Sequence, residues 1–110
     1  MPALGRTVFQ GESGQRYRFK VFPLGTRFRK LGGVFVIGSR PQGASQRRRI
    51  VPIFVGHTED FSQPADLHLK AQDFTAQGAN CICVQSDAVE ESRRTKEQDL
   101  VAGLRPACNE

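Results

Sequence analysis

The strict alternation of side chains in residues 15–22 limits the fold of this chain more than any other feature. One set of alternate residues is apolar or aromatic, namely Tyr17, Phe19 and Val21. The residues between them are all cationic, namely Arg16, Arg18 and Lys20. Successive side chains of a strand point to opposite faces of a sheet. The pattern therefore predicts a strand with one buried face and one positively charged outer face.

Three further segments are predicted to be strands because they are short, apolar and rich in β-branched or aromatic residues. They cover residues 34–37, 50–55 and 79–84. Pro52 cannot donate a ladder hydrogen bond, which places its strand at an edge of the sheet or at a bulge. The polar stretch 40–49 is predicted to be a loop.

Two segments of the second half show helical spacing. Residues 63–77 are predicted to form a helix, with Ser62 at the N-cap and Gly78 at the left-handed C′ position. Asp87 and Glu90 resemble a capping box for a second helix. The predicted fold is therefore α/β in the α+β sense, with a small, mainly antiparallel sheet of three to five strands flanked by two or more helices.

The length and composition indicate a single globular domain over residues 1–110. Hydrophobic residues make up 38% and charged residues 25% of the chain, which is ordinary globular usage. No apolar run is long enough to span a bilayer, so no membrane partner is expected. The first residues lack the apolar run of a secretory signal, and the expected location is cytoplasmic.

Positive charge is concentrated in the first half of the chain. Residues 1–50 hold eleven Lys or Arg against the single acid Glu12, whereas residues 51–110 hold five against ten acids. Such a basic surface either contacts the phosphates of a nucleic acid or is simply solvated. The candidate nucleic-acid-binding residues are Arg16, Arg18, Lys20, Arg40, Arg47, Arg48 and Arg49.

Glu97 is the candidate metal ligand. It precedes Leu100, Val101 and Leu104 by three, four and seven residues, so it shares the apolar face of the second helix. A carboxylate there suits Mg²⁺ or Mn²⁺. The alternative is a glutamate at the margin of this face, whose stem packs while its carboxylate remains in water.

The chain from residue 33 onward combines two short phenylalanine-centred segments with a helix, a strand, a second helix and a terminal Pro-x-x-Asn. These features are Gly33-Val34-Phe35, Phe54-Val55-Gly56-His57-Thr58, the helix that contains Glu97, and Arg105-Pro106-Ala107-Cys108-Asn109. Their order resembles that of the GIY-YIG nuclease domain. The resemblance makes residues 33–109 a GIY-YIG-like core and residues 1–32 an N-terminal strand extension.

The resemblance implies a metal-dependent site that hydrolyses phosphodiesters with two tyrosines, a helix arginine, a glutamate that binds the metal, and an asparagine. Carried over to this chain, the family-site positions are Phe35, Phe54, Thr58, Glu97 and Asn109. Both tyrosine positions therefore hold phenylalanine. No arginine occurs between residues 56 and 78, where His68 and Lys70 are the cationic candidates for that role.

These replacements remove groups that the implied chemistry needs. Phenylalanine has no hydroxyl to accept a proton or to orient water, and loss of the guanidinium removes a clamp on the phosphate. We therefore expect a catalytically impaired GIY-YIG-like domain that binds nucleic acid. One alternative is a protein–protein interaction module or regulator on the same fold. Another is an active metal-dependent endonuclease with a variant site, in which His57 or His68 serves as the base.

Overall fold

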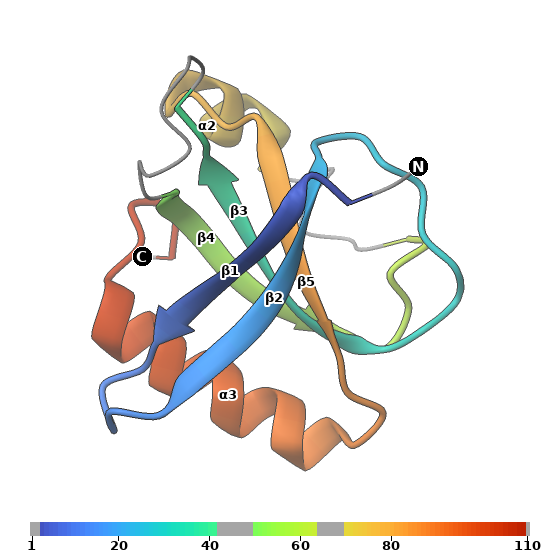
Figure 1. The fold of residues 1–110 in the computed structure, drawn as a ribbon, viewed down its shortest axis with the longest axis vertical. Coiled ribbons are helices and arrows are strands. Elements are labelled where there is room, and N and C mark those ends of the chain that lie inside the picture. Colours follow the sequence, from blue (N-terminus) through green and yellow to red (C-terminus); the bar gives the residue numbers. More distant parts are fainter. Residues whose placement is uncertain (1–2, 42–49, 64–69, 110) are drawn as a thin grey trace.

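The computed structural model describes residues 3–41, 50–63 and 70–109, and in these ranges it forms one antiparallel sheet with two helices (Figure 1). The strands are β1 (Gly5–Gln10), β2 (Arg16–Pro23), β3 (Gly33–Ser39), β4 (Val51–Thr58) and β5 (Cys81–Ser86). The helices are α2 (Ala71–Ala76) and α3 (Glu90–Leu104). The predicted α+β class, with a mainly antiparallel sheet flanked by helices, is confirmed.

The strand order of the sheet is β1-β2-β5-β3-β4, and every neighbouring pair is antiparallel. β5 comes late in the sequence but lies in the centre, where Cys83 is paired with Val21 on one side and Val36 on the other. The β1–β2 and β3–β4 pairs are therefore joined into one sheet by a strand that follows both of them in the chain.

The sheet has an apolar core on each face, because buried side chains alternate between the two faces along each central strand. The helix-side core, which α3 covers through Leu100, contains Phe9, Phe19, Val21, Val34, Val36, Val55, Cys81 and Cys83. The far-side core on the other face contains Phe35, Ile37, Ile53, Phe54, Phe61, Phe74 and Ile82. Figure 1 shows α3 running along one side of the sheet, and α2 at the opposite end of the molecule.

Asp99 ties the turn between β1 and β2 to α3. Its carboxylate accepts hydrogen bonds from the Ser13 N–H at 2.8 Å, the Ser13 hydroxyl at 2.7 Å and the Tyr17 hydroxyl at 2.7 Å. Burial and the hydrogen bond to Asp99 raise the pKa of Tyr17 to about 12. The pKa of Asp99 is held below its usual value, mainly by the hydrogen bond that it accepts from the Ser13 hydroxyl. The hairpin is therefore anchored to the helix by a charged acceptor.

Most of the predicted elements are present, with bounds that differ by a few residues. Pro52 was predicted to lie at an edge or at a bulge, and both are found: β4 is an edge strand, and the β3–β4 register shifts between Ile37, which is paired with Phe54, and Gly38, which is paired with Pro52. β1 was not predicted, since Val8 is half-exposed and only Phe9 of this strand is buried. Of the helix predicted over residues 63–77, α2 forms the described helical part, and residues 64–69 lie outside the described ranges. Among the described residues, no helix is both long and apolar enough to cross a membrane.

Candidate functional site

Phe35 and Phe54 lie side by side in the far-side core. Their ring centroids are 6.0 Å apart, and their exposed fractions are 0% and 5%. Gly56 faces Phe35 across the strand pair, where an added Cβ would lie 2.7 Å from Cζ of Phe35 and 2.8 Å from Cε2 of Phe54. The glycine of this motif therefore makes room for two buried rings. These contacts explain the phenylalanine-centred segments by packing alone.

Lys70 lies over the second of these rings. Its Nζ is 4.6 Å from the centroid of the Phe54 ring and donates a hydrogen bond to the Cys108 carbonyl at 3.0 Å. A cation over an aromatic face is attracted by the ring quadrupole. Lys70 therefore joins the start of α2 to the C-terminal segment. His68, the other cationic candidate, lies outside the described residues.

Asn109 completes the outer edge of β4. Its side-chain Oδ1 accepts a hydrogen bond from the Val55 N–H, and its Nδ2 donates one to the Val55 carbonyl, both at 2.7 Å. The Cys108 N–H also bonds the Ile53 carbonyl at 2.9 Å. An edge strand presents unpaired backbone groups, and the asparagine amide satisfies two of them. Its observed role is thus to hold the chain end against the sheet.

Glu97 lies on the other side of the sheet from the two phenylalanines. It is half-buried on α3, three residues before Leu100, which packs in the helix-side core. Phe35 and Phe54 belong to the far-side core. The structure therefore brings Phe35, Phe54 and Asn109 to β3 and β4 but does not bring Glu97 to them. Within the described ranges, no group of three or more His, Cys, Asp or Glu side chains gathers to hold a metal ion.

Thr58 and His57 end β4 in different surroundings. The Thr58 hydroxyl accepts a hydrogen bond from the Asp60 N–H at 3.1 Å and donates one to the Asp60 carbonyl at 3.2 Å, so it stabilises the following turn. His57 is paired with Val34, and its side chain therefore lies on the face that α3 covers. Its Nδ1 is buried and has no hydrogen-bond partner among the described residues. Thr58 is two residues after Gly56, the partner of Phe35, so it lies on the same face of the sheet as Phe35, whereas His57 lies on the opposite face.

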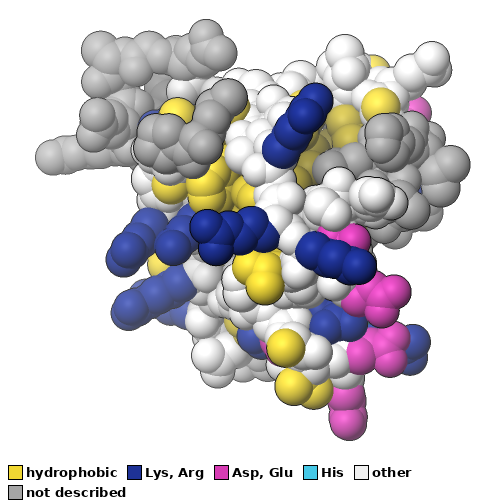
Figure 2. All heavy atoms as spheres, turned by 90° about the vertical axis from the view of Figure 1, so that its right-hand side faces the viewer, with side chains coloured by type: hydrophobic (Ala, Val, Ile, Leu, Met, Phe, Trp, Pro, Cys, Tyr) yellow, Lys and Arg dark blue, Asp and Glu magenta, His cyan; other side chains and the backbone are white. Residues whose placement is uncertain are grey.

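The predicted cationic face of β2 is present. Arg16, Arg18 and Lys20 are exposed, and they alternate with residues of the helix-side core. β1 adds Arg6, which is paired with Lys20 across the strands, and sequence analysis did not identify it. Figure 2 shows one group of Lys and Arg side chains without Asp or Glu beside it at the left of the view, whereas Asp and Glu lie at the right with further Lys and Arg among them.

Of the other predicted nucleic-acid-binding residues, Arg40 does not belong to the cationic face of β2. Arg40 follows the end of β3, where its N–H bonds Oδ1 of Asn80 at 2.7 Å and its carbonyl accepts from Nδ2 of Asn80 at 2.8 Å. Its backbone is therefore held in place, and its side chain is half-buried. Residues 47–49 lie outside the described ranges.

A groove of about 630 Å³ runs over the face of β2 that points away from α3. Its cationic lining comes from Arg6, Arg18, Lys20 and Arg29, and no Asp or Glu is among its described lining residues. Aromatic rings of Phe22, Phe28 and Phe61 form part of the same lining. The groove thus combines positive charge with an apolar surface. The alternation in β2 identified two of the four cations, but Phe28 and Arg29 lie in a connection without periodicity, which gave no signal.

Comparisons with protein-family models, with curated proteins and with solved structures found no match for this chain.

Proposed function

We propose that this domain binds nucleic acid through the groove on β1 and β2 and does not cleave it. The observation that carries the proposal is the groove lining, in which Arg6, Arg18, Lys20 and Arg29 occur without an acidic residue among the described lining residues. A polyanion gains most from a surface where several cations act together, because each neutralised phosphate releases counterions. The order of β3, β4, α2, β5 and α3 is the one expected for the GIY-YIG-like core that we propose for residues 33–109, but Glu97 does not lie with Phe35 and Phe54 as the family site would require.

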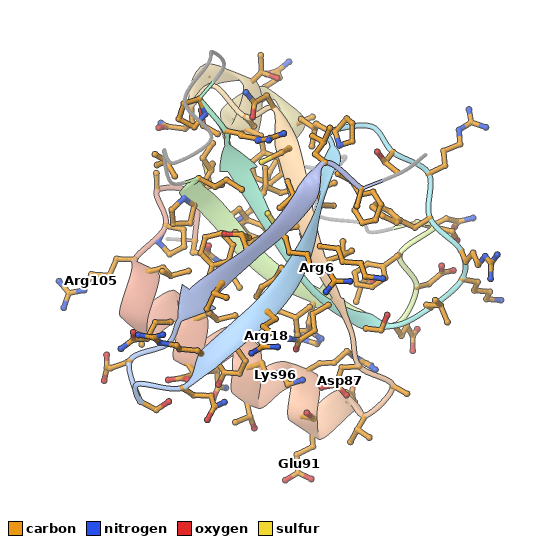
Figure 3. All side chains as sticks on the ribbon, viewed as in Figure 1. Arg6, Arg18, Asp87, Glu91, Lys96 and Arg105 are labelled. Carbon is orange, nitrogen blue, oxygen red and sulfur yellow. The ribbon has the colours of Figure 1, made fainter. Side chains whose placement is uncertain are left out.

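The cations of the groove are available to a ligand. Arg94 forms a side-chain ion pair with Glu90, and Lys96 forms one with Asp87, and neither of these pairs involves a groove cation. A phosphate would therefore not have to displace a described carboxylate. Figure 3 places Arg6 and Arg18 on β1 and β2, away from Arg105 at the end of α3. This separation means that binding through the groove can be distinguished from binding through the rest of the positive charge.

The absence of cleavage follows from the positions of the groups that the family mechanism would use. Phe35 and Phe54 carry no hydroxyl, and both rings are buried in the far-side core. Glu97 lies on the opposite side of the sheet. A general base must be within hydrogen-bond reach of the proton that it takes. A metal at Glu97 would not share a substrate with either ring.

The test combines binding and cleavage in one preparation. The protein is incubated with Mg²⁺ or Mn²⁺ and with plasmid, and at low salt with labelled oligonucleotides. We expect a mobility shift without nicking. The triple variant Arg47→Ala, Arg48→Ala, Arg49→Ala measures what the connection between β3 and β4 adds to the affinity.

Two results would overturn the proposal. Robust cutting that disappears in Glu97→Ala would indicate an active endonuclease with a variant site, in which His57 or His68 acts as the base. No shift with single-stranded or duplex DNA or RNA at low salt would favour the protein-interaction module instead.

A further inference from the structure

The apolar part of the groove is an aromatic cluster that reaches the surface. The Phe22 and Phe28 rings are 5.1 Å apart at 88°, and the Phe28 and Phe61 rings are 5.9 Å apart at 51°. Phe61 is buried, whereas Phe22 and Phe28 are partly exposed. Leu31 beside them is 51% exposed and also lines the groove. The groove therefore offers aromatic surface to a ligand, held in place from beneath by a buried ring.

The cations are arranged along this aromatic surface. Arg6 and Lys20 face each other across β1 and β2, and Arg18 follows on the same side of β2. Arg29 comes directly after Phe28 in the chain and lines the same groove. Positive charge and exposed aromatic surface thus lie within one groove. A positively charged groove with aromatic side chains is the arrangement by which proteins bind unpaired bases and their backbone.

We propose that the groove binds single-stranded nucleic acid, with its phosphates on the arginines and lysine and an unpaired base against Phe28. The inference rests on the proposed function and specifies its substrate class. A duplex keeps the faces of its bases stacked inside the helix, so it can use the cations but not the phenylalanine. A volume of about 630 Å³ falls in the range of roughly 300–1,000 Å³ that is usual for small-ligand sites, which suits one nucleotide with its neighbours extending along β2.

The chain contains no tryptophan, so one introduced tryptophan reports on its own surroundings. The test variant is Phe28→Trp, and the matched control is Val89→Trp, because Val89 is 59% exposed just before α3 and does not line the groove. Each variant is titrated with the same sequence as a deoxyribo- and a ribo-oligonucleotide, in single-stranded and in duplex form. We expect single strands to quench the fluorescence of Phe28→Trp and to leave that of Val89→Trp unchanged.

Affinity provides the second readout. Phe28→Leu keeps an apolar side chain but removes the ring, and it should weaken single-strand binding by roughly 5- to 150-fold, as expected for loss of one base–aromatic stack. Phe28→Tyr keeps the ring and should bind like the wild type. Duplex affinity should be equal in all three. If Phe28→Leu does not fold, the quenching experiment decides alone.

The outcomes separate this inference from the proposed function. Equal binding of single strands and duplex, with no quenching at position 28, would overturn the single-strand inference and leave the nucleic-acid proposal standing. No binding of any oligonucleotide would overturn both. A preference between the deoxyribo and ribo forms would identify which single strand is the ligand.

Discussion

Replacing Phe35 with tyrosine would restore a family hydroxyl at a position where the structure has neither room nor a partner for it. The ring is fully buried, and the new oxygen would be attached to Cζ, the atom that lies 2.7 Å from a Cβ built on Gly56. The surrounding far-side core is apolar, with Phe54 at 6.0 Å between ring centroids. The hydroxyl would therefore be both crowded and without a hydrogen bond.

The expected cost of Phe35→Tyr has two parts. A buried hydroxyl without a partner costs about 1–3 kcal/mol, and overpacking of a filled core costs about 1–3 kcal/mol more. The free energy of unfolding should fall by the sum, about 2–6 kcal/mol. With a denaturant slope of about 1.5 kcal/mol per molar urea, a loss of 3 kcal/mol lowers the urea midpoint by about 2 M.

Urea unfolding followed by far-UV circular dichroism measures this shift. Phe28→Tyr is the matched control, because Phe28 is partly exposed and its new hydroxyl can reach water, so its free energy of unfolding should change by no more than about 0.5 kcal/mol. An unchanged midpoint for Phe35→Tyr would refute the packing explanation of this segment. So would the appearance of metal-dependent nicking in the same variant.

Three further predictions concern other contacts. Asn109→Ala should lower the free energy of unfolding by about 1–3 kcal/mol, since two hydrogen bonds are removed, and leave oligonucleotide affinity unchanged; an equal loss of binding would contradict this structural role. Gly56→Ala should cost about 1–3 kcal/mol by overpacking, which Phe35→Leu should partly relieve in a double variant, and strict additivity of the two changes would contradict the contact. A hydrogen bond from Ser92 is the main reason why the pKa of Asp87 is lowered to about 2 from 3.8. Ionised Asp87 therefore stabilises the folded state above pH 4, and this stabilisation is lost as the pH falls toward 2. The stability difference between wild type and Asp87→Asn should narrow over that range, and a constant difference would refute the assignment.

Local patterns predicted the elements of the fold better than their arrangement. The alternation in β2 correctly predicted its buried and charged faces. Phe19 and Val21 are 2% and 3% exposed, while the cations that alternate with them are exposed. β1 was not predicted, because only Phe9 of this strand is buried and Val8 is half-exposed, so the sequence of β1 lacks a clear apolar alternation. The insertion of β5 between β2 and β3 depends on long-range pairing, which no local pattern encodes.

For the candidate site too, single residues were predicted better than their arrangement in space. The sequence identified the phenylalanine pair and Asn109, which do meet at β3 and β4, but helical spacing could not show which face of the sheet α3 would cover. The resemblance to the GIY-YIG domain grouped Glu97 with the two phenylalanines, and the sheet separates it from them. The groove itself was not predicted, because its lining residues come from β1, β2, β5 and the connections, which are distant from one another in the sequence.

The salt dependence of binding tests the central proposal most directly. Arg18→Gln with Lys20→Gln removes two groove cations, and Arg94→Gln with Arg105→Gln removes the same charge from α3 and the residue after it. For a single strand, the slope of log K against log salt changes by about 0.7 for each phosphate that the protein no longer neutralises. We predict that the groove variant reduces the magnitude of this slope by about 1.4, twice that value, and that the α3 variant leaves it unchanged. Equal slopes for the two variants would show that the groove does not bind the phosphates.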